Sequence, residues 1–164
     1  MNTNFRKLLF LVVVLLLLAA LPYGLRYAHQ HGGLYLFSRQ FLEDVPKRLR
    51  GPGRFRFVMQ PAVAILLGIR AGKRDAQAGR APYFLRILLD RENRVTLLKE
   101  GLLDLAALVA MAILLDIVSQ FLILRAVYPG AALVIGPVLI AVPYAVSRAL
   151  SNRWVVQRRA LTHL

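Results

Sequence analysis

One acidic residue lies in the middle of a long apolar stretch, where a charge is costly. Asp116 is the twelfth of the 20 residues in 105–124, and no other charged side chain occurs in that segment. Ser119 and Gln120 follow at three and four residues, so on a helix they share a face with Asp116. Ionisable residues within membrane segments mark proton or ion pathways, or pair with polar groups of neighbouring helices. Asp116, Ser119 and Gln120 are therefore the candidate functional residues.

Three roles for the Asp116 carboxyl group are open from the sequence alone. In the preferred one, the group is protonated or hydrogen-bonded to Gln120, Gln60 or Tyr144, and it only holds helices together. In the second, it couples the movement of a proton or an ion. In the third, it pairs with a partner subunit. A charge at the centre of a span costs about 2.5–3.5 kcal/mol, which the apolar residues of 105–124 can offset.

A second set of residues is basic and lies beside the apolar segments. Basic clusters next to a membrane attract anionic headgroups, each residue contributing about 1 kcal/mol. We therefore predict contacts with anionic lipid, and no nucleic-acid partner because nothing but charge suggests one. The predicted contact residues are Lys47, Arg48, Arg50, Arg54, Arg56, Arg70, Lys73 and Arg74.

Other kinds of chemistry have little support in the sequence. The chain has no cysteine, which excludes disulfides, thiolate metal sites and a cysteine nucleophile. His29 and His31 could share a metal ion, but no third ligand is near them in the sequence. There is no phosphate-binding glycine loop, serine-nucleophile motif or zinc-binding helix motif. We therefore expect no enzymatic activity, no metal and no cofactor.

The elements that must position these residues are membrane helices. Hydrophobic residues make up 58% of the 164 residues, yet the formal net charge is +14, so the two properties are segregated along the chain. Uncharged segments predict spans at about 8–25, which we interpret as an uncleaved anchor, at 105–124 and at 131–147. The apolar segment 57–69 reaches only about 20 Å as a helix, so we expect a re-entrant or interfacial helix there. Four spans are the alternative.

The last two spans are joined by a very short connection. Pro129 and Gly130 suit the central positions of a type II turn, which makes 105–124 and 131–147 an antiparallel helical hairpin. The predicted fold is thus an all-α membrane protein, a single membrane domain over residues 1–164, with three transmembrane helices and one short re-entrant or interfacial helix.

An amphipathic pattern precedes the apolar segment 57–69. Leu34, Phe37, Phe41, Val45 and Leu49 recur at three- and four-residue spacing, with charged residues largely off that face. The apolar face either lies at the headgroup boundary or packs on the rest of the protein.

The distribution of Lys and Arg predicts the orientation. Residues 26–56 hold seven of the 22 basic residues and residues 70–99 hold eight, whereas the hairpin connection holds only Arg125. Basic residues concentrate on the cytoplasmic side. We therefore predict cytoplasmic regions at 26–56 and 70–100, an external N-terminus, an external hairpin turn and a cytoplasmic C-terminus.

Two segments, FVMQPAVAILLGIRAGKRDAQAGRAPYF and LLDIVSQFLILRAVYPG, resemble small uncharacterised bacterial integral-membrane proteins. The resemblance implies an inner-membrane location and brings no activity. We expect a non-enzymatic accessory or scaffold subunit that packs against other membrane proteins or itself, with Ala106/Ala110 and Ala132/Gly136 as small-residue contact faces. The alternative is a small oligomeric transporter or proton/ion pathway that uses Asp116.

Overall fold

The computed structural model describes residues 3–82 and 94–162, and within these ranges every regular element is helical. The elements are α1 (Thr3–His31), a 3-10 turn η1 (Tyr35–Phe37), α2 (Arg39–Arg50), α3 (Arg56–Gln77), α5 (Arg94–Leu124) and α6 (Pro129–Thr162). The predicted all-α fold is confirmed.

Three of the described helices have the length and apolarity to cross a membrane. They are Thr3–His31, Leu105–Leu124 and Pro129–Arg159, which confirms the three predicted spans. The first and third extend beyond their predicted bounds because the helices continue into the basic flanks. The segment 57–69 lies within α3, which has 22 residues and is not among these three. Part of the predicted basic region 70–100, residues 83–93, lies outside the described residues.

The chain divides into two compact units, and the predicted single membrane domain stays a prediction. Unit 1 comprises Met1–Val58 and Ala107–Leu139, and unit 2 comprises Met59–Ala106 and Ile140–Leu164. Because α3, α5 and α6 are long, each of them runs from one unit into the other.

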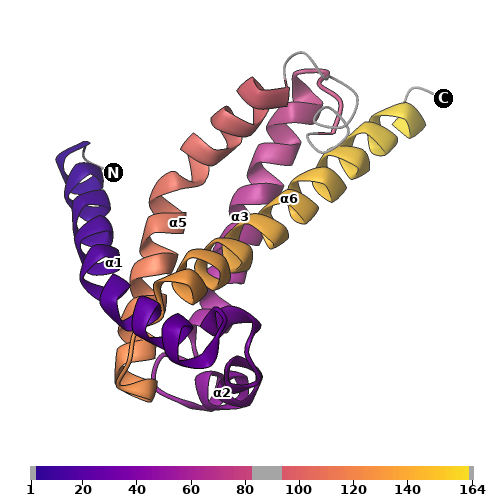
Figure 1. The fold of residues 1–164 in the computed structure, drawn as a ribbon. Helices are drawn as coiled ribbons and strands as arrows, with labels where there is room; N and C mark the ends of the chain where they lie inside the picture. The colour runs from indigo at the N-terminus through magenta and orange to yellow at the C-terminus, as the bar shows by residue number, and fades with distance from the viewer. Residues whose placement is uncertain (1–2, 83–93, 163–164) are drawn as a thin grey trace. The chain divides into compact units, whose positions relative to one another are not determined.

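Unit 1 is built on close contact between α1, α5 and α6. Its core contains Leu9 and Val13 of α1, Ile113 and Ile117 of α5, and Ala132 of α6. The start of α1 contacts the part of α5 where unit 1 begins. The last turns of α1 contact the α5–α6 connection. The two helices are therefore parallel. Figure 1 shows α1 and α5 running side by side in this direction.

The small residues offered as contact faces for a partner are used inside unit 1. Ala110 and Ala132 are buried in the core. A Cβ atom at Gly136 would lie 2.9 Å from the backbone nitrogen of Ile113, so α5 and α6 pack there at backbone distance. That part of the partner-surface prediction is wrong, because the two helices of the hairpin bury these residues against each other.

The predicted hairpin forms, but its turn differs from the predicted type II turn. Pro129 is the first residue of α6, where a missing N–H costs nothing, and Gly130 is not at positive φ. The left-handed residue is Arg125, with φ 53°, directly after α5. The chain therefore reverses at the end of α5, four residues before Pro129.

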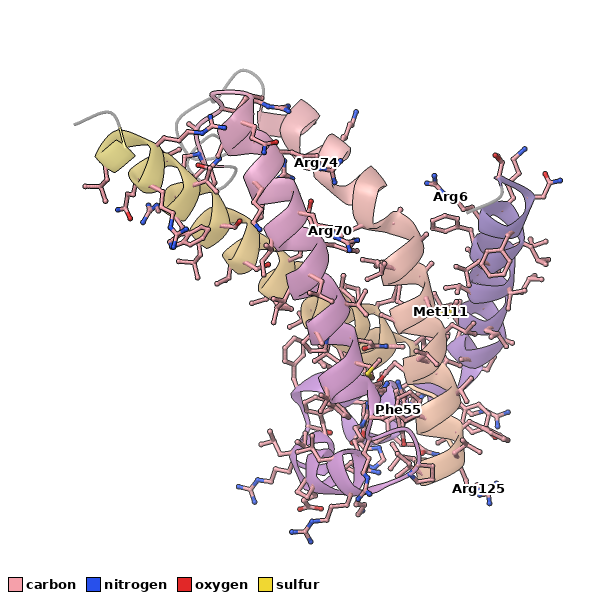
Figure 2. All side chains as sticks on the ribbon, turned by 180° about the vertical axis from the view of Figure 1, so that it is seen from behind. Arg6, Phe55, Arg70, Arg74, Met111 and Arg125 are labelled. Carbon is pink, nitrogen blue, oxygen red and sulfur yellow. The ribbon has the colours of Figure 1, made fainter. Side chains whose placement is uncertain are left out.

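Residues 35–56 lie at the same end of unit 1 as the hairpin connection. The Tyr35 ring stacks on Tyr128 with centroids 3.6 Å apart, and a Cβ atom at Gly51 would lie 2.9 Å from the side chain of Ile123. Figure 1 shows α2 beside the α5–α6 connection, and Figure 2 shows Phe55 and Arg125 near one end of unit 1 with Arg6 at the other. Residues 35–56 of the predicted cytoplasmic region and the predicted external hairpin turn thus lie at one end of unit 1, and the orientation stays a prediction.

Unit 2 is held by close packing of α3 on α6. A Cβ atom at Gly68 would lie 2.6 Å from the carbonyl oxygen of Tyr144, and one at Gly72 would lie 3.0 Å from the Cβ of Ser151. Only glycine allows so close an approach at these two positions, although the charged Arg70 between them makes the spacing unlike that of a membrane-helix contact. The Asp75 carboxylate accepts a hydrogen bond from Arg148 Nε at 2.7 Å and completes the contact.

Candidate functional site

The candidate site is a buried ionic cluster around Asp116 in unit 1. The Asp116 side chain is fully buried. Arg48, Arg56 and Gln120 contact it, and Tyr35 contacts Arg48. We call Asp116, Arg48, Arg56, Gln120 and Tyr35 the Asp116 cluster.

The first arginine comes from α2. Arg48 is 1% exposed, and its Nη1 donates to Asp116 Oδ1 at 3.5 Å. Its Nη2 donates to the Tyr35 hydroxyl at 3.4 Å. The guanidinium also lies 5.8 Å from the ring centroid of Tyr35 and 5.7 Å from that of Phe41, so aromatic faces surround part of the charge.

The second arginine begins α3. Arg56 is also 1% exposed, and its Nη1 is in close contact with the same oxygen, Asp116 Oδ1. Its guanidinium carbon lies 4.7 Å from the ring centroid of Phe57. The two guanidinium groups therefore share one carboxylate oxygen.

The second carboxylate oxygen binds within the hairpin. Gln120 Nε2 donates to Asp116 Oδ2 at 2.6 Å, one helical turn along α5. Gln120 Oε1 accepts from the backbone N–H of Tyr128 at 2.8 Å. Asp116 is thus connected through Gln120 to the α5–α6 connection, and Gln120 is one of the three hydrogen-bond partners considered from the sequence.

The local sequence explains how the arginines reach this depth. Asp44 and Arg48 are one turn apart on α2, and both are buried, whereas Phe37, Leu42 and Leu49 are exposed. One polar stripe of α2, Asp44 and Arg48, therefore points into unit 1, while its other charged residues are exposed. Phe41 of the apolar face packs against the core formed by Tyr27, Tyr35 and Ala131, whereas Leu49 is exposed, so this face is divided between the protein and the surroundings.

Close packing of the α2–α3 connection against α5 completes the geometry. Gly53 has φ +83°, and a Cβ atom there would lie 3.7 Å from the Cβ of Ser119. Ser119 is buried at this contact. Of the three candidate residues, Asp116 and Gln120 thus form the ionic cluster and Ser119 packs beside it.

A hydrogen-bonded group on η1 and α2 extends the cluster. The Tyr35 hydroxyl donates to Asp44 Oδ2 at 2.8 Å, and Lys47 Nζ lies 2.8 Å from Asp44 Oδ1. Burial raises the pKa of the Tyr35 hydroxyl well above its usual value, so this group stays a neutral donor. The hydrogen bond to Asp44 raises the pKa of the exposed Lys47.

Two of the eight predicted lipid contacts are corrected by these positions. Arg48 and Arg56 are buried against Asp116 and cannot contact headgroups, because burial of an arginine requires a counter-charge and Asp116 supplies it. The other six are exposed, and their contact with lipid stays a prediction: Lys47, Arg50, Arg54, Arg70, Lys73 and Arg74. Figure 2 shows Arg70 and Arg74 on α3 in unit 2.

The cluster connects, through ion pairs, parts of the chain that are distant in the sequence. Both carboxylate oxygens of Asp116 are engaged, and two positive charges face one negative charge. Within residues 3–82 and 94–162, no group of three or more His, Cys, Asp or Glu residues could hold a metal ion. The arrangement can join α2, the start of α3 and the hairpin by charge.

Comparison with known protein families, characterised proteins and solved structures gave no match to this chain.

Proposed function

We propose that this chain is a non-enzymatic, multi-pass protein of the bacterial inner membrane that serves as an accessory or scaffold subunit of a membrane assembly. One observation supports this above the others: Asp116, the acid in the middle of a span, has both of its oxygens engaged within the chain. An ion-coupling carboxylate must exchange its partners during transport, and a structural one keeps them.

We propose a topology that adds α3, as a fourth crossing, to the three helices that are long and apolar enough to span. Residues 35–56 share one end of unit 1 with the hairpin connection, and a spanning α5 has its first residues on the opposite side. The chain between residues 57 and 104 must then cross the membrane. We assign the crossing to α3: its uncharged part 57–69 extends about 20 Å, and Arg56 at its start already lies at the depth of Asp116.

The distribution of charge then favours cytoplasmic N- and C-termini. Residues 6–7, 70–99 and 148–159 hold 14 of the 22 basic residues and face the cytoplasm in this topology. Residues 26–56 and Arg125 hold the other eight on the outer side, and two of those eight, Arg48 and Arg56, are buried against Asp116. Six of these eight basic residues are then left to oppose the preference of basic residues for the cytoplasmic side.

A matched pair of cysteine variants tests the topology. Arg54 and Arg74 are both exposed arginines, and the chain has no cysteine of its own. In intact cells, a membrane-impermeant maleimide should label Arg54→Cys and leave Arg74→Cys unlabelled until the membrane is permeabilised. Labelling of Arg74→Cys alone would reverse the orientation, and exclusion of both would restore the three-span arrangement with a cytoplasmic region 26–56.

Purification of the full chain in mild detergent, followed by native mass spectrometry, tests the role. An accessory subunit should purify in a fixed ratio with one other membrane protein. A closed ring of this chain alone would support the alternative, a transporter built by oligomerisation around Asp116. A lone monomer would contradict both.

A further inference from the structure

A groove in unit 2 has the composition of a lipid site. It lies along α3 and α6 and has a volume of about 750 Å³. That volume falls within the roughly 300–1,000 Å³ of small-molecule pockets, although this groove is open along its length. Its floor is the close contact of the two helices, where Ser151 Oγ donates to the carbonyl oxygen of Ile69 at 3.0 Å.

The polarity of the groove changes along both helices in the same direction. Ile65 and Ile69 line it on α3, followed one turn later by Lys73. Leu150 lines it on α6, followed by Arg153 and Trp154. Since Gly68 approaches Ser147 and Gly72 approaches Ser151, the two helices are parallel here, and their polar ends coincide. One end of the groove is therefore apolar and the other is basic and aromatic.

The charge at the polar end is positive and unbalanced. Among the described residues, Lys73 and Arg153 take part in no ion pair. The acid of this unit nearest in sequence to Lys73, Asp75, is buried and paired with Arg148 and Arg80. The Arg158 guanidinium lies 4.0 Å from the Trp154 ring centroid. A ligand here must offer a negative group beside an apolar tail.

We propose that this groove binds one anionic glycerophospholipid, with an acyl chain along Ile65, Ile69 and Leu150 and the phosphate between Lys73 and Arg153. Trp154 lies where tryptophan is favoured in membrane proteins, at the boundary between hydrocarbon and headgroups. This inference deepens the proposed contact with anionic lipid: it names a bound molecule and rests on the proposed embedding of α3.

Trp154 is the only tryptophan of the chain, so its fluorescence reports on this groove alone. The full chain is reconstituted in nanodiscs containing phosphatidylglycerol or phosphatidylcholine brominated on the acyl chain, and quenching of Trp154 is measured against the mole fraction of brominated lipid. Two surface cations correspond to a preference for phosphatidylglycerol of about 30-fold. Glycerol phosphate, added in solution, should not relieve the quenching.

Matched double variants separate a site from general attraction. Lys73→Gln with Arg153→Gln should abolish the preference, and Lys73→Arg with Arg153→Lys should retain it. Lys47→Gln with Arg54→Gln removes the same charge from unit 1 and should change the preference by no more than about twofold.

Equal quenching by the two lipids in the wild-type chain would overturn the proposal, and so would equal losses in the two glutamine variants. Relief by glycerol phosphate would identify a soluble phosphate ligand and contradict the lipid. Native mass spectrometry of the same preparation reports the partner separately, so failure of the lipid site and failure of the accessory role are distinguishable.

Discussion

Replacement of Asp116 by Asn should destabilise unit 1 more than any other change to a single charge. Asn keeps the size and a hydrogen-bonding oxygen but removes the negative charge that Arg48 and Arg56 share. Both guanidinium groups would then be buried with no counter-charge. Breaking a buried ion pair from one side costs about 3–5 kcal/mol, and with two arginines affected we expect the upper part of that range.

Substitution of an arginine should cost far less than substitution of the aspartate. Arg48→Met removes the more distant guanidinium and leaves one positive and one negative charge in the cluster. We expect a change within about 1 kcal/mol, because the loss of a long hydrogen bond is offset by removal of an excess buried charge. The triple variant Arg48→Met, Arg56→Met, Asp116→Leu should be close to wild type or more stable.

The assay is unfolding of the purified chain in mild detergent by titration with dodecyl sulfate, followed by helical circular dichroism. Glu43→Gln, at an exposed position on α2, is the matched control and should change the free energy of unfolding by less than about 0.5 kcal/mol. If Asp116→Asn behaves like Glu43→Gln, the carboxylate is not the counter-charge. If Arg48→Met costs as much as Asp116→Asn, the sharing of one charge by two arginines is wrong.

Further predictions concern the two units separately. Gly68→Leu should separate α3 from α6, because the leucine side chain would occupy the space of Ser147. A disulfide or spin-label contact between these two helices should then be lost while the helix content is kept. An unchanged contact would refute the prediction. Alkaline pH should destabilise unit 1, because the pKa values of Tyr35 and Lys47 are raised in the folded state. Their contribution to the free energy of unfolding is therefore complete below about pH 10 and falls as the pH increases further. Lys47 contributes less than Tyr35 because it is exposed. Tyr35→Phe should flatten this dependence in a pH series of the same titration, and an equally steep fall would exclude Tyr35 as its cause.

The helices and the special position of Asp116 could be predicted from the sequence because both depend on local composition. A run of uncharged residues long enough to span predicts a membrane helix, and an acid within it must find a partner. Gln120, one turn away on the same helix, was predicted for the same reason.

The other partners of Asp116 could not be found in this way. Arg48 and Arg56 lie 68 and 60 residues away in the sequence, in a region whose many basic residues all looked equally suited to lipid. One signal was present: Asp44 and Arg48 share a helix face, which would suit a buried polar face as well as an exposed one. Which face points inward depends on the medium, and in a membrane the usual preference for apolar residues inside is weakened.

The proposed orientation departs from the one predicted by counting basic residues, for a related reason. Counting basic residues assumes that all of them are free to face water, yet Arg48 and Arg56 are neutralised within the chain. The close approach of Gly68 and Gly72 to α6 was also missed, because Arg70 between them made the segment look unlike a membrane contact.

Formation of a disulfide between residues 53 and 119 tests most directly the claim that the α2–α3 connection lies against the second half of α5. A Cβ atom at Gly53 would lie 3.7 Å from the Cβ of Ser119, within the range that disulfides span. On mild oxidation of native membranes, Gly53→Cys with Ser119→Cys should lose both thiols to an intramolecular bond, while Arg6→Cys with Ser119→Cys should keep both. Two reactive thiols in the first pair under the same oxidation would contradict the Asp116 cluster and the topology that follows from it.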